Sequence, residues 1–345
     1  MLALLLALSA DCTGLVPASL PSVVDVSPAS DCWLVSLDGA GDVAISTGSS
    51  WWPLFASDGT KLGISFVSPS MPRSSGWYSL RTFPPAAASW KARVTSIDAR
   101  GNVLGEVEFT DAAVRLFVLP NDDGLLLTES STASAWQVRV TEVSPAAAVV
   151  SGPTVVTAAS GPPRSGEFDA FAARDGALLL SLQGWMLPPF RNNQRIGRWF
   201  DASGTPLTNW FLAVDQTLEG TTALALPDGG IVVAGRGQRT VAVQSRVAAA
   251  QPAPSWSATT SLWQRIFVLR DRIASVDQSF DKCEQVITIR APAGNVCGEV
   301  RVPVERDRIG QCPYAPKHIG QDGTLVQERV GGSYCHLRWW PRLLR

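Results

Sequence analysis

The chain has 345 residues, of which 46% are hydrophobic and 17% are charged, and its formal net charge is −1 at pH 7. Because such a chain lacks the basic field that nucleic-acid binding requires, we exclude a nucleic-acid partner. Its glycines (29) and prolines (24) are frequent enough for a turn-rich β-protein and too rare for a disordered chain. Beyond the N-terminus, no run approaches the roughly 20 apolar residues that span a bilayer, so we expect no transmembrane segment.

The first ten residues read MLALLLALSA, an apolar run that ends in small residues. This pattern is typical of the hydrophobic region and cleavage site of a secretory signal, although the positively charged region is missing. We therefore predict that residues 1–11 are a signal peptide or its remnant and that residues 12–345 form one domain; the alternative is a merely apolar terminus. A lipid-attachment role for Cys12 is disfavoured because Asp11, rather than a small residue, precedes it.

An aspartate–glycine pair followed by an apolar stretch recurs along the chain. Its copies are Asp38-Gly39, Asp123-Gly124, Asp175-Gly176, Asp228-Gly229 and Asp322-Gly323, with Asp271-Arg272 as a degenerate copy. Successive intervals, taken in chain order, are 85, 52, 53, 43 and 51 residues. A period of about 40–50 residues is that of a four-stranded propeller blade, and the longest interval fits two blades of which one lost its pair. The spacing predicts a seven-bladed β-propeller, with six or eight blades as alternatives.

Residues 222–259 contain one complete repeat. Strands are predicted at 222–226, 231–235, 241–247 and 255–259, and Asp228-Gly229 makes the first turn. The same order fits residues 113–156, 169–214, 264–304 and 314–340, and residues 76–80 are expected to be a strand of the degenerate second blade. Amphipathic helical patterns are essentially missing. We therefore predict an all-β fold of antiparallel blades.

A second pattern supports the same period. Trp90 and Trp136 each begin the sequence Trp-x-x-Arg-Val-Thr, which contains Arg93 and Arg139. Later arginines close alternating stretches at similar spacing: Arg198, Arg246, Arg290 and Arg338. Because an even spacing keeps side chains on one strand face, these arginines are expected to form a structural row.

Two segments carry a family resemblance. Residues 223–235 read ALALPDGGIVVAG and residues 198–204 read RWFDASG. They resemble the delta-60 repeats of bacterial propellers, which have an Arg-x-x-Asp-x-x-Gly hairpin and a Pro-Asp-Gly-Lys-Ile strand entry. The resemblance is good over one repeat, partial over four and poor before Gly101. It implies a secreted or surface propeller and supplies no catalytic residues.

The six cysteines lie only near the two ends of the chain: Cys12, Cys32, Cys283, Cys297, Cys312 and Cys335. Only five residues follow Trp340, too few for a fourth strand, so we expect an N-terminal segment such as residues 15–26 to complete the last blade. A covalent link is most stabilising at such a closure. We predict at least one disulfide within the last two blades or tying the N-terminal segment to them, with 15 connectivities open. A zinc site is disfavoured because no C-x-x-C pair exists and only His318 and His336 are present.

Long, irregular connections follow the second and fourth predicted strands, at residues 46–52, 82–89, 157–168, 184–193 and 213–220. Loops on a rigid scaffold often carry function, so we expect these connections to form a binding face. The candidate binding residues on it are Trp51, Trp52, Trp185, Phe190 and Arg191. The alternative for loop 184–193 is packing back onto the propeller. Tryptophans within strands, at positions 90, 136, 199, 256, 263 and 339, are expected to pack in the core.

Catalytic patterns are weak. Carboxylates for glycoside chemistry could come from Glu129, Asp169, Asp215, Glu219 or Asp277, each of which is better explained as a solvated charge. Segments 57–59 and 96–101 are similar to the aspartate boxes of sialidase propellers but lack their spacing. We therefore expect an exported, non-catalytic module without cofactor or metal, secreted, periplasmic or at the cell surface, that binds a protein or a glycan. The alternative is a carbohydrate-active hydrolase or lyase with carboxylates in a central funnel.

Overall fold

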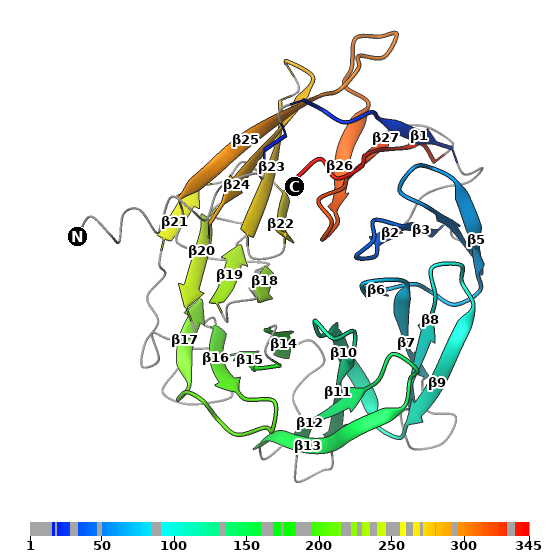
Figure 1. The fold of residues 1–345 in the computed structure, drawn as a ribbon. Helices are drawn as coiled ribbons and strands as arrows, with labels where there is room; N and C mark the ends of the chain where they lie inside the picture. Colours follow the sequence, from blue (N-terminus) through cyan, green and yellow to red (C-terminus); the bar gives the residue numbers. More distant parts are fainter. Residues whose placement is uncertain are drawn as a thin grey trace. The chain divides into compact units, whose positions relative to one another are not determined.

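A computed structural model describes residues 16–17, 19–27, 34–46, 50–83, 91–131, 136–159, 168–173, 176–183, 195–214, 222–225, 230–234, 240–245, 256–259, 265–269, 272–279, 281–291, 295–329 and 335–344. Within these ranges the regular structure is β-strand (Figure 1). The strands form seven four-stranded sheets, each antiparallel in its recorded pairings and built almost entirely from consecutive strands. Contacts divide the chain into two compact units.

The first unit covers Met1–Trp77, Asp98–Asn102 and Ser261–Arg345. One of its sheets is β2 (Leu34–Leu37), β3 (Val43–Ser46), β4 (Trp52–Phe55) and β5 (Lys61–Ser65). A second is β22 (Arg265–Leu269), β23 (Arg272–Ser279), β24 (Glu284–Arg290) and β25 (Val296–Pro303). The third contains β26 (Tyr314–Ile319), β27 (Leu325–Arg329), β28 (Leu337–Trp340) and β1 (Val24–Val26).

The second unit covers Tyr78–Ile97 and Val103–Thr260. Its sheets are β10 (Ala112–Val118), β11 (Gly124–Ser131), β12 (Trp136–Val143) and β13 (Val149–Ala159); β14 (Phe168–Ala172), β15 (Leu178–Gln183), β16 (Arg195–Phe200) and β17 (Phe211–Val214); and β18 (Thr222–Ala225), β19 (Gly230–Ala234), β20 (Thr240–Ser245) and β21 (Trp256–Thr259). The remaining sheet is β6 (Met71–Pro72), β7 (Trp77–Phe83), β8 (Lys91–Ile97) and β9 (Val103–Phe109), of which β6 and Trp77 are counted with the first unit.

The predicted repeat boundaries agree with these sheets to within a few residues. The expected strand at 76–80 is present as β7, and the arginine row lies on the third strands: Arg93 in β8, Arg139 in β12, Arg198 in β16, Arg290 in β24 and Arg338 in β28. Arg246 lies outside the described residues. Ionic partners hold several of these arginines, as in the 2.6 Å pair of Arg93 with Glu108 and the 2.9 Å pair of Arg139 with Asp111.

The N-terminal strand completes the last sheet, as expected. Strand β1 pairs antiparallel with β28, with Val24 opposite Trp339 and Val26 opposite Leu337. In Figure 1 the blue β1 lies beside the orange and red strands of this sheet. The Arg338 guanidinium binds both oxygens of Asp25, at 2.7 and 3.0 Å. Two ends of the chain are therefore joined by backbone pairing and a bidentate ion pair.

Most described hairpin turns have one five-residue geometry. The first residue donates its N–H to the fifth carbonyl, the fourth residue donates to the first carbonyl, and the fourth residue has positive φ. Glycine accepts that φ without strain, which explains Gly41, Gly101 and Gly204. In one variant an aspartate at the first position accepts N–H groups from the third and fifth residues: Asp38, Asp98, Asp201 and Asp307.

The recurring aspartate–glycine pairs mark the connection between the first and second strands, but they do not occupy one turn position. Asp322-Gly323 stands at the third and fourth positions, whereas Asp38-Gly39 stands at the first and second. Gly124 already belongs to β11, and Asp122, with a φ of 68°, takes the fourth position instead. The period was therefore predicted correctly, and the pairs occupy different turn positions from one sheet to the next.

Neighbouring sheets pack through hydrophobic cores. In the first unit, Leu37 and Val43 lie in one cluster with Val326, Leu337 and Trp339. In the second unit, Val138 and Val140 of β12 pack with residues of β15 and β16. Tight contacts with backbone explain two strand glycines, because a Cβ on Gly63 would lie 2.5 Å from the Arg100 carbonyl oxygen and one on Gly105 would lie 2.0 Å from that of Ala146.

Candidate functional site

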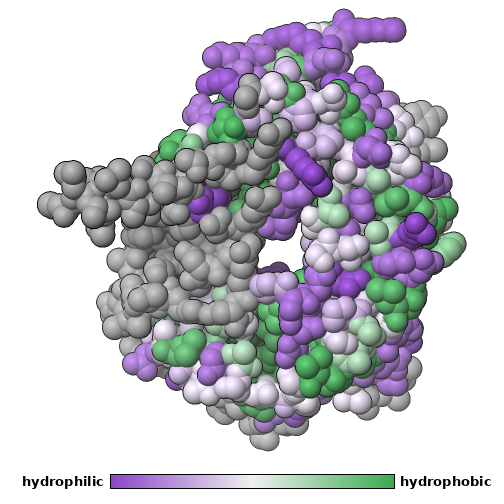
Figure 2. All heavy atoms as spheres, in the orientation of Figure 1, coloured by the Kyte–Doolittle hydropathy of each residue, from purple (hydrophilic) through white to green (hydrophobic). Residues whose placement is uncertain are grey.

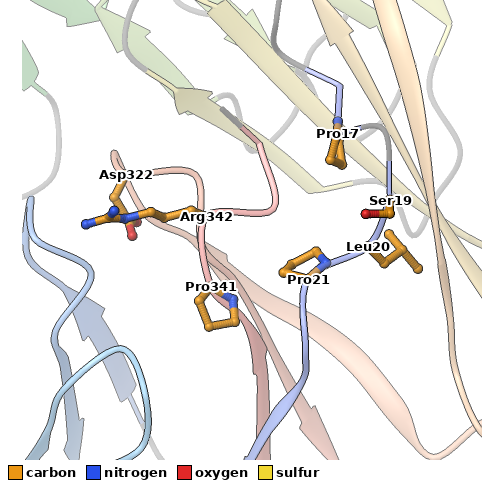
Figure 3. Close-up of a pocket in the computed structure, with 7 residues that line it drawn as sticks. All are labelled: Pro17, Ser19, Leu20, Pro21, Asp322, Pro341 and Arg342. Carbon is orange, nitrogen blue, oxygen red and sulfur yellow. The ribbon is translucent and has the colours of Figure 1, made fainter.

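The first unit contains a cavity of about 660 Å³ beside the last sheet (Figure 3). One wall is the segment that precedes β1, with Pro17 and Pro21, and the other follows β28, with Pro341 and Arg342. Figure 3 shows the Arg342 side chain extending toward Asp322 of the β26–β27 turn. The cavity thus combines rigid proline surface with one guanidinium and one carboxylate.

The Asp322 carboxylate is occupied by its own turn. Its Oδ1 accepts the Thr324 N–H at 3.0 Å and its Oδ2 accepts the Thr324 hydroxyl at 2.6 Å, and the residue is only 9% exposed. Nearby, burial lowers the pKa of His318 to about 4, against the opposing effect of the Asp322 charge. His318 is therefore a neutral ring at physiological pH, packed edge-on against Phe267.

Two further carboxyls stand in the neighbouring β2–β3 turn. Burial raises the pKa of Asp38 to about 6, even though its oxygens accept N–H groups from Ala40, Asp42 and Gly76. Burial also raises the pKa of Asp42, and the negative charges of Asp322 and Asp58 add to that rise. Acid–base chemistry needs two interacting carboxyls beside a cavity, and Asp42 and Asp322 interact in this way. However, the carboxylates of Asp38 and Asp322 already accept hydrogen bonds within their own turns.

A second feature of the first unit is the connection from β25 to β26. Residues 307–311 form the aspartate-led turn, in which the Asp307 Oδ1 accepts N–H groups from Ile309 and Gln311 at 3.0 and 2.8 Å. Ile309 is 77% exposed, and Arg308 beside it is exposed as well. We call residues 306–310 the 306–310 tip.

The base of this tip is fixed to the β23–β24 connection. Cys312 forms a disulfide with Cys283, and the Arg306 guanidinium donates to the carbonyls of Gly310 and Asp281. The Val304 N–H donates to the Cys283 carbonyl at 2.7 Å. A covalent bond and three hydrogen bonds thus hold an exposed apolar side chain in a defined position, which lowers the conformational entropy lost on binding.

Apart from this tip, exposed hydrophobic residues are dispersed. Figure 2 shows them in separate groups among hydrophilic residues on the face that it presents. The most exposed in the described ranges are Phe66 at 79% and Ile309 at 77%. Among the residues coloured on that face, the apolar groups are separated by hydrophilic ones.

The predicted binding residues fall into two groups. Trp51 is 37% exposed just before β4, whereas Trp52 is the first residue of β4 and only 9% exposed, so its ring is not presented to a ligand. Trp185, Phe190 and Arg191 lie outside the described residues, as does most of the loop set expected to form the binding face.

The cysteine prediction is confirmed for the last two sheets. Cys283 pairs with Cys312, which joins the β23–β24 connection to the segment before β26. Cys297 and Cys335 are also disulfide-bonded. Cys12 and Cys32 lie outside the described residues.

The structure describes the side chains of two of the five predicted carboxylates. Glu129 lies in β11 and Asp277 in β23, both half-buried. Asp169 is in β14 with its side chain outside the described set, and Asp215 and Glu219 lie outside it altogether.

Two tryptophans predicted in the core are buried, Trp199 at 1% and Trp339 at 0% exposure. Trp136 and Trp256 are strand residues whose rings are not described, and Trp90 and Trp263 lie outside the described residues.

None of the described residues forms a helix long and apolar enough to cross a membrane. In the same part of the chain, no three histidine, cysteine, aspartate or glutamate residues are grouped to hold a metal ion.

Seven four-stranded antiparallel sheets made from consecutive strands, with the first strand completing the last sheet, define the architecture. The chain is a β-propeller. It is similar to the structure titled complex of KlAtg21 with the coiled coil of AgAtg16, with 14% identity, a TM-score of 0.51 and coverage of 89% of this chain and 97% of that one. It is also similar to Chaetomium thermophilum Raptor, with 8% identity, a TM-score of 0.54 and coverage of 96% of this propeller but 30% of Raptor.

A third similar structure is the Cps50 (Swd1) β-propeller domain of Myceliophteria thermophila, with 11% identity, a TM-score of 0.46 and coverage of 94% and 99%. No protein-family model matches the sequence. A search of curated proteins gives no match either. The likeness to solved structures concerns the fold.

Sequence reasoning did not single out Arg342, Asp42 or the 306–310 tip as functional features. Asp322 was recognised only as a turn residue. The tip did carry a signal, because Asp307-Arg-Ile-Gly310 has the same Asp-x-x-Gly spacing as Asp201-Ala-Ser-Gly204 and ends four positions before the strand that begins at Tyr314.

Proposed function

We propose that this propeller is an exported, non-catalytic recognition or scaffold module that binds a protein at the cell surface or outside the cell. In this proposal residues 1–11 are removed as a signal peptide, and the domain at 12–345 belongs to the delta-60-like bacterial propellers. The four described cysteines are all oxidised, which supports an oxidising compartment. A glycan partner is the second form of the same proposal.

The observation that carries the proposal is the 306–310 tip. An exposed isoleucine beside an exposed arginine, held by a disulfide and by Arg306, has the composition and rigidity of an interface anchor. Such a tip fits an apolar pocket with a carboxylate at its edge. The carboxyls near the cavity, by contrast, serve turns, as Asp322 does for Thr324.

The test uses the purified chain as bait for the secreted and surface proteins of the organism that produces it. Ile309→Asp is compared with Val296→Asp, which adds the same charge at another exposed aliphatic residue (52% exposed). We expect a partner to be cross-linked by the wild type and by Val296→Asp, and to be lost with Ile309→Asp at unchanged melting temperature. Equal capture by all three proteins contradicts the proposed role of the tip.

One observation favours the alternative, a carbohydrate-active hydrolase or lyase: the raised pKa of Asp42 near Asp322, beside a cavity with Arg342. A screen of neutral and acidic polysaccharides for new reducing ends, or for the absorbance of unsaturated uronates, tests it. We expect no cleavage. Cleavage that disappears in Asp42→Asn would replace the recognition proposal with the enzymatic one.

A further inference from the structure

The second unit has a cavity of its own, of about 340 Å³, where the sheet β10–β13 meets the sheet β14–β17. Its lining includes two buried apolar residues, Leu125 and Val140, at 4% and 6% exposure. Leu119 and Pro120 of the β10–β11 turn continue this apolar lining toward the solvent. An alkyl chain could therefore be covered on several sides.

A carboxylate stands at the end of this apolar lining. On β12, Val138 and Val140 point into the core shared with β15 and β16. Glu142 follows two residues later, on the same face of the strand, and lines the cavity in a half-buried position. Its Oε2 accepts the hydroxyl of Ser151, its β13 partner, at 3.1 Å. The other carboxylate oxygen has no hydrogen-bond donor among the described residues.

Two aspartates adjoin residues that line the same cavity as Glu142. Asp123 is hydrogen-bonded to the lining residue Asn121 at 2.6 Å, and Asp201 precedes the lining residue Ala202. No lysine or arginine is among the described lining residues. A partly desolvated carboxylate with negative neighbours attracts a cation more strongly than a fully solvated one.

We propose that this cavity binds a lysine or arginine side chain of a partner protein. The alkyl stem lies on Leu125 and Val140, and the cationic head pairs with Glu142 at the rim. The Ser151 hydroxyl holds the carboxylate in position, so little side-chain entropy is lost when the pair forms. The site is separate from the 306–310 tip and does not depend on it.

The test measures the anisotropy of a fluorescent peptide, acetyl-(Gly-Lys)4-amide, as the full chain is added. The comparison peptide carries acetyl-lysine, which keeps the stem and removes the charge. Glu142→Gln keeps an acceptor for the Ser151 hydroxyl and removes the negative charge. Glu299→Gln in β25, with a side chain 49% exposed, is the matched control.

We expect Glu142→Gln to raise the Kd for the lysine peptide about fivefold to tenfold, the effect of losing one partly buried ion pair. Glu299→Gln should change it by less than about twofold. The acetyl-lysine peptide should bind the wild type as weakly as the lysine peptide binds Glu142→Gln. Ile309→Asp should leave binding unchanged, which separates this site from the proposed tip interface.

Three results overturn the proposal. The first is no measurable binding of the lysine peptide. The second is an equal loss with Glu142→Gln and Glu299→Gln, which would indicate general electrostatic attraction. The third is equal binding of the acetylated peptide, which would indicate that the apolar lining or the peptide backbone alone makes the contact.

Discussion

At the scale of single residues, aspartates that accept the same turn hydrogen bonds have pKa values shifted in opposite directions. Asp38 and Asp201 each accept N–H groups from the residues two and four places later. Asp201 remains partly exposed to solvent, and the Ser203 hydroxyl and the Thr205 N–H lower its pKa. Asp38 is fully buried, and burial outweighs its hydrogen bonds and raises its pKa to about 6. Solvent exposure, rather than the turn geometry, decides the direction.

The buried Asp38 should therefore make stability depend on pH. Its folded pKa lies above the ordinary value of 3.8, so its contribution to stability is complete below about pH 4 and is lost as pH rises through about 6. The full loss is on the order of 3 kcal/mol. We expect the stability advantage of the wild type over Asp38→Asn to shrink by up to that amount between pH 4 and 7, measured by urea unfolding.

Carbon-13 NMR of the Asp38 carboxyl gives an independent measurement, with an expected titration midpoint near 6. A midpoint below 4 would contradict the dominant role of burial. Asp201→Asn is the control, because its lowered folded pKa predicts a dependence of opposite sign.

At the scale of elements, the turns explain why glycine recurs and why its positions differ in importance. Gly310 and Gly323 have φ values of 80° and 85°, and both hold the fourth turn position. A Cβ on Gly310 would meet nothing within 4 Å, whereas one on Gly323 would lie 1.7 Å from the Leu344 carbonyl oxygen. Glycine is therefore required at position 310 only by the backbone conformation, whereas at position 323 it is required by packing as well.

This pair predicts unequal costs for one substitution. Gly310→Ala should cost about 1–2 kcal/mol, the price of a left-handed alanine. Gly323→Ala should cost at least about 2 kcal/mol more, because the segment after β28 must move as well. Chemical unfolding midpoints of the two variants provide the measurement, and equal costs would show that the Leu344 segment moves freely.

The disulfide between Cys283 and Cys312 also acts between elements, because it holds the 306–310 tip to the β23–β24 connection. It links residues 29 positions apart, so replacing Cys283 and Cys312 by serine should lower stability by about 2–4 kcal/mol. The variant should also lose affinity for the cross-linked partner at temperatures where it remains folded. Unchanged affinity would show that Arg306 alone suffices to hold the tip.

The sheets could be predicted from the sequence because their turns recur at a steady spacing and five of them carry an arginine on the third strand, and both are local signals. The closing strand could be predicted because so few residues follow Trp340. Local register was less accessible, since Asp38-Gly39 and Asp322-Gly323 look alike but hold different turn positions. The position of a pair within its turn depends on which residues are buried, and burial depends on the neighbouring sheets.

At the scale of the whole molecule, the candidate sites join residues that are distant in sequence. The cavity of Figure 3 needs Pro17 and Arg342, and the second cavity needs Glu142 and Ala202. No spacing rule connects such pairs, because their proximity follows from how whole sheets pack. The sequence could therefore predict the scaffold and only part of what the scaffold displays.

The cysteines give a prediction at this scale. Val16 lies against Gly298, next to Cys297, and the Ser27 hydroxyl is 3.0 Å from Nδ1 of His336, next to Cys335. We therefore predict that Cys297 and Cys335 pair with Cys12 and Cys32. Peptide mapping without reduction should recover Cys297 linked to either Cys12 or Cys32, and Cys335 linked to the other. Titration of the unfolded, unreduced chain should detect no free thiol.

The pairing of β1 with β28 has a consequence for biosynthesis. Asp25 and Arg338 are 313 residues apart, so the ribosome makes the first edge strand long before its partner exists. Until the C-terminal strands emerge, β1 cannot obtain its native hydrogen bonds, and the terminal sheet stays incomplete. A nascent chain with this order of strands postpones the closure of its terminal sheet to the end of synthesis.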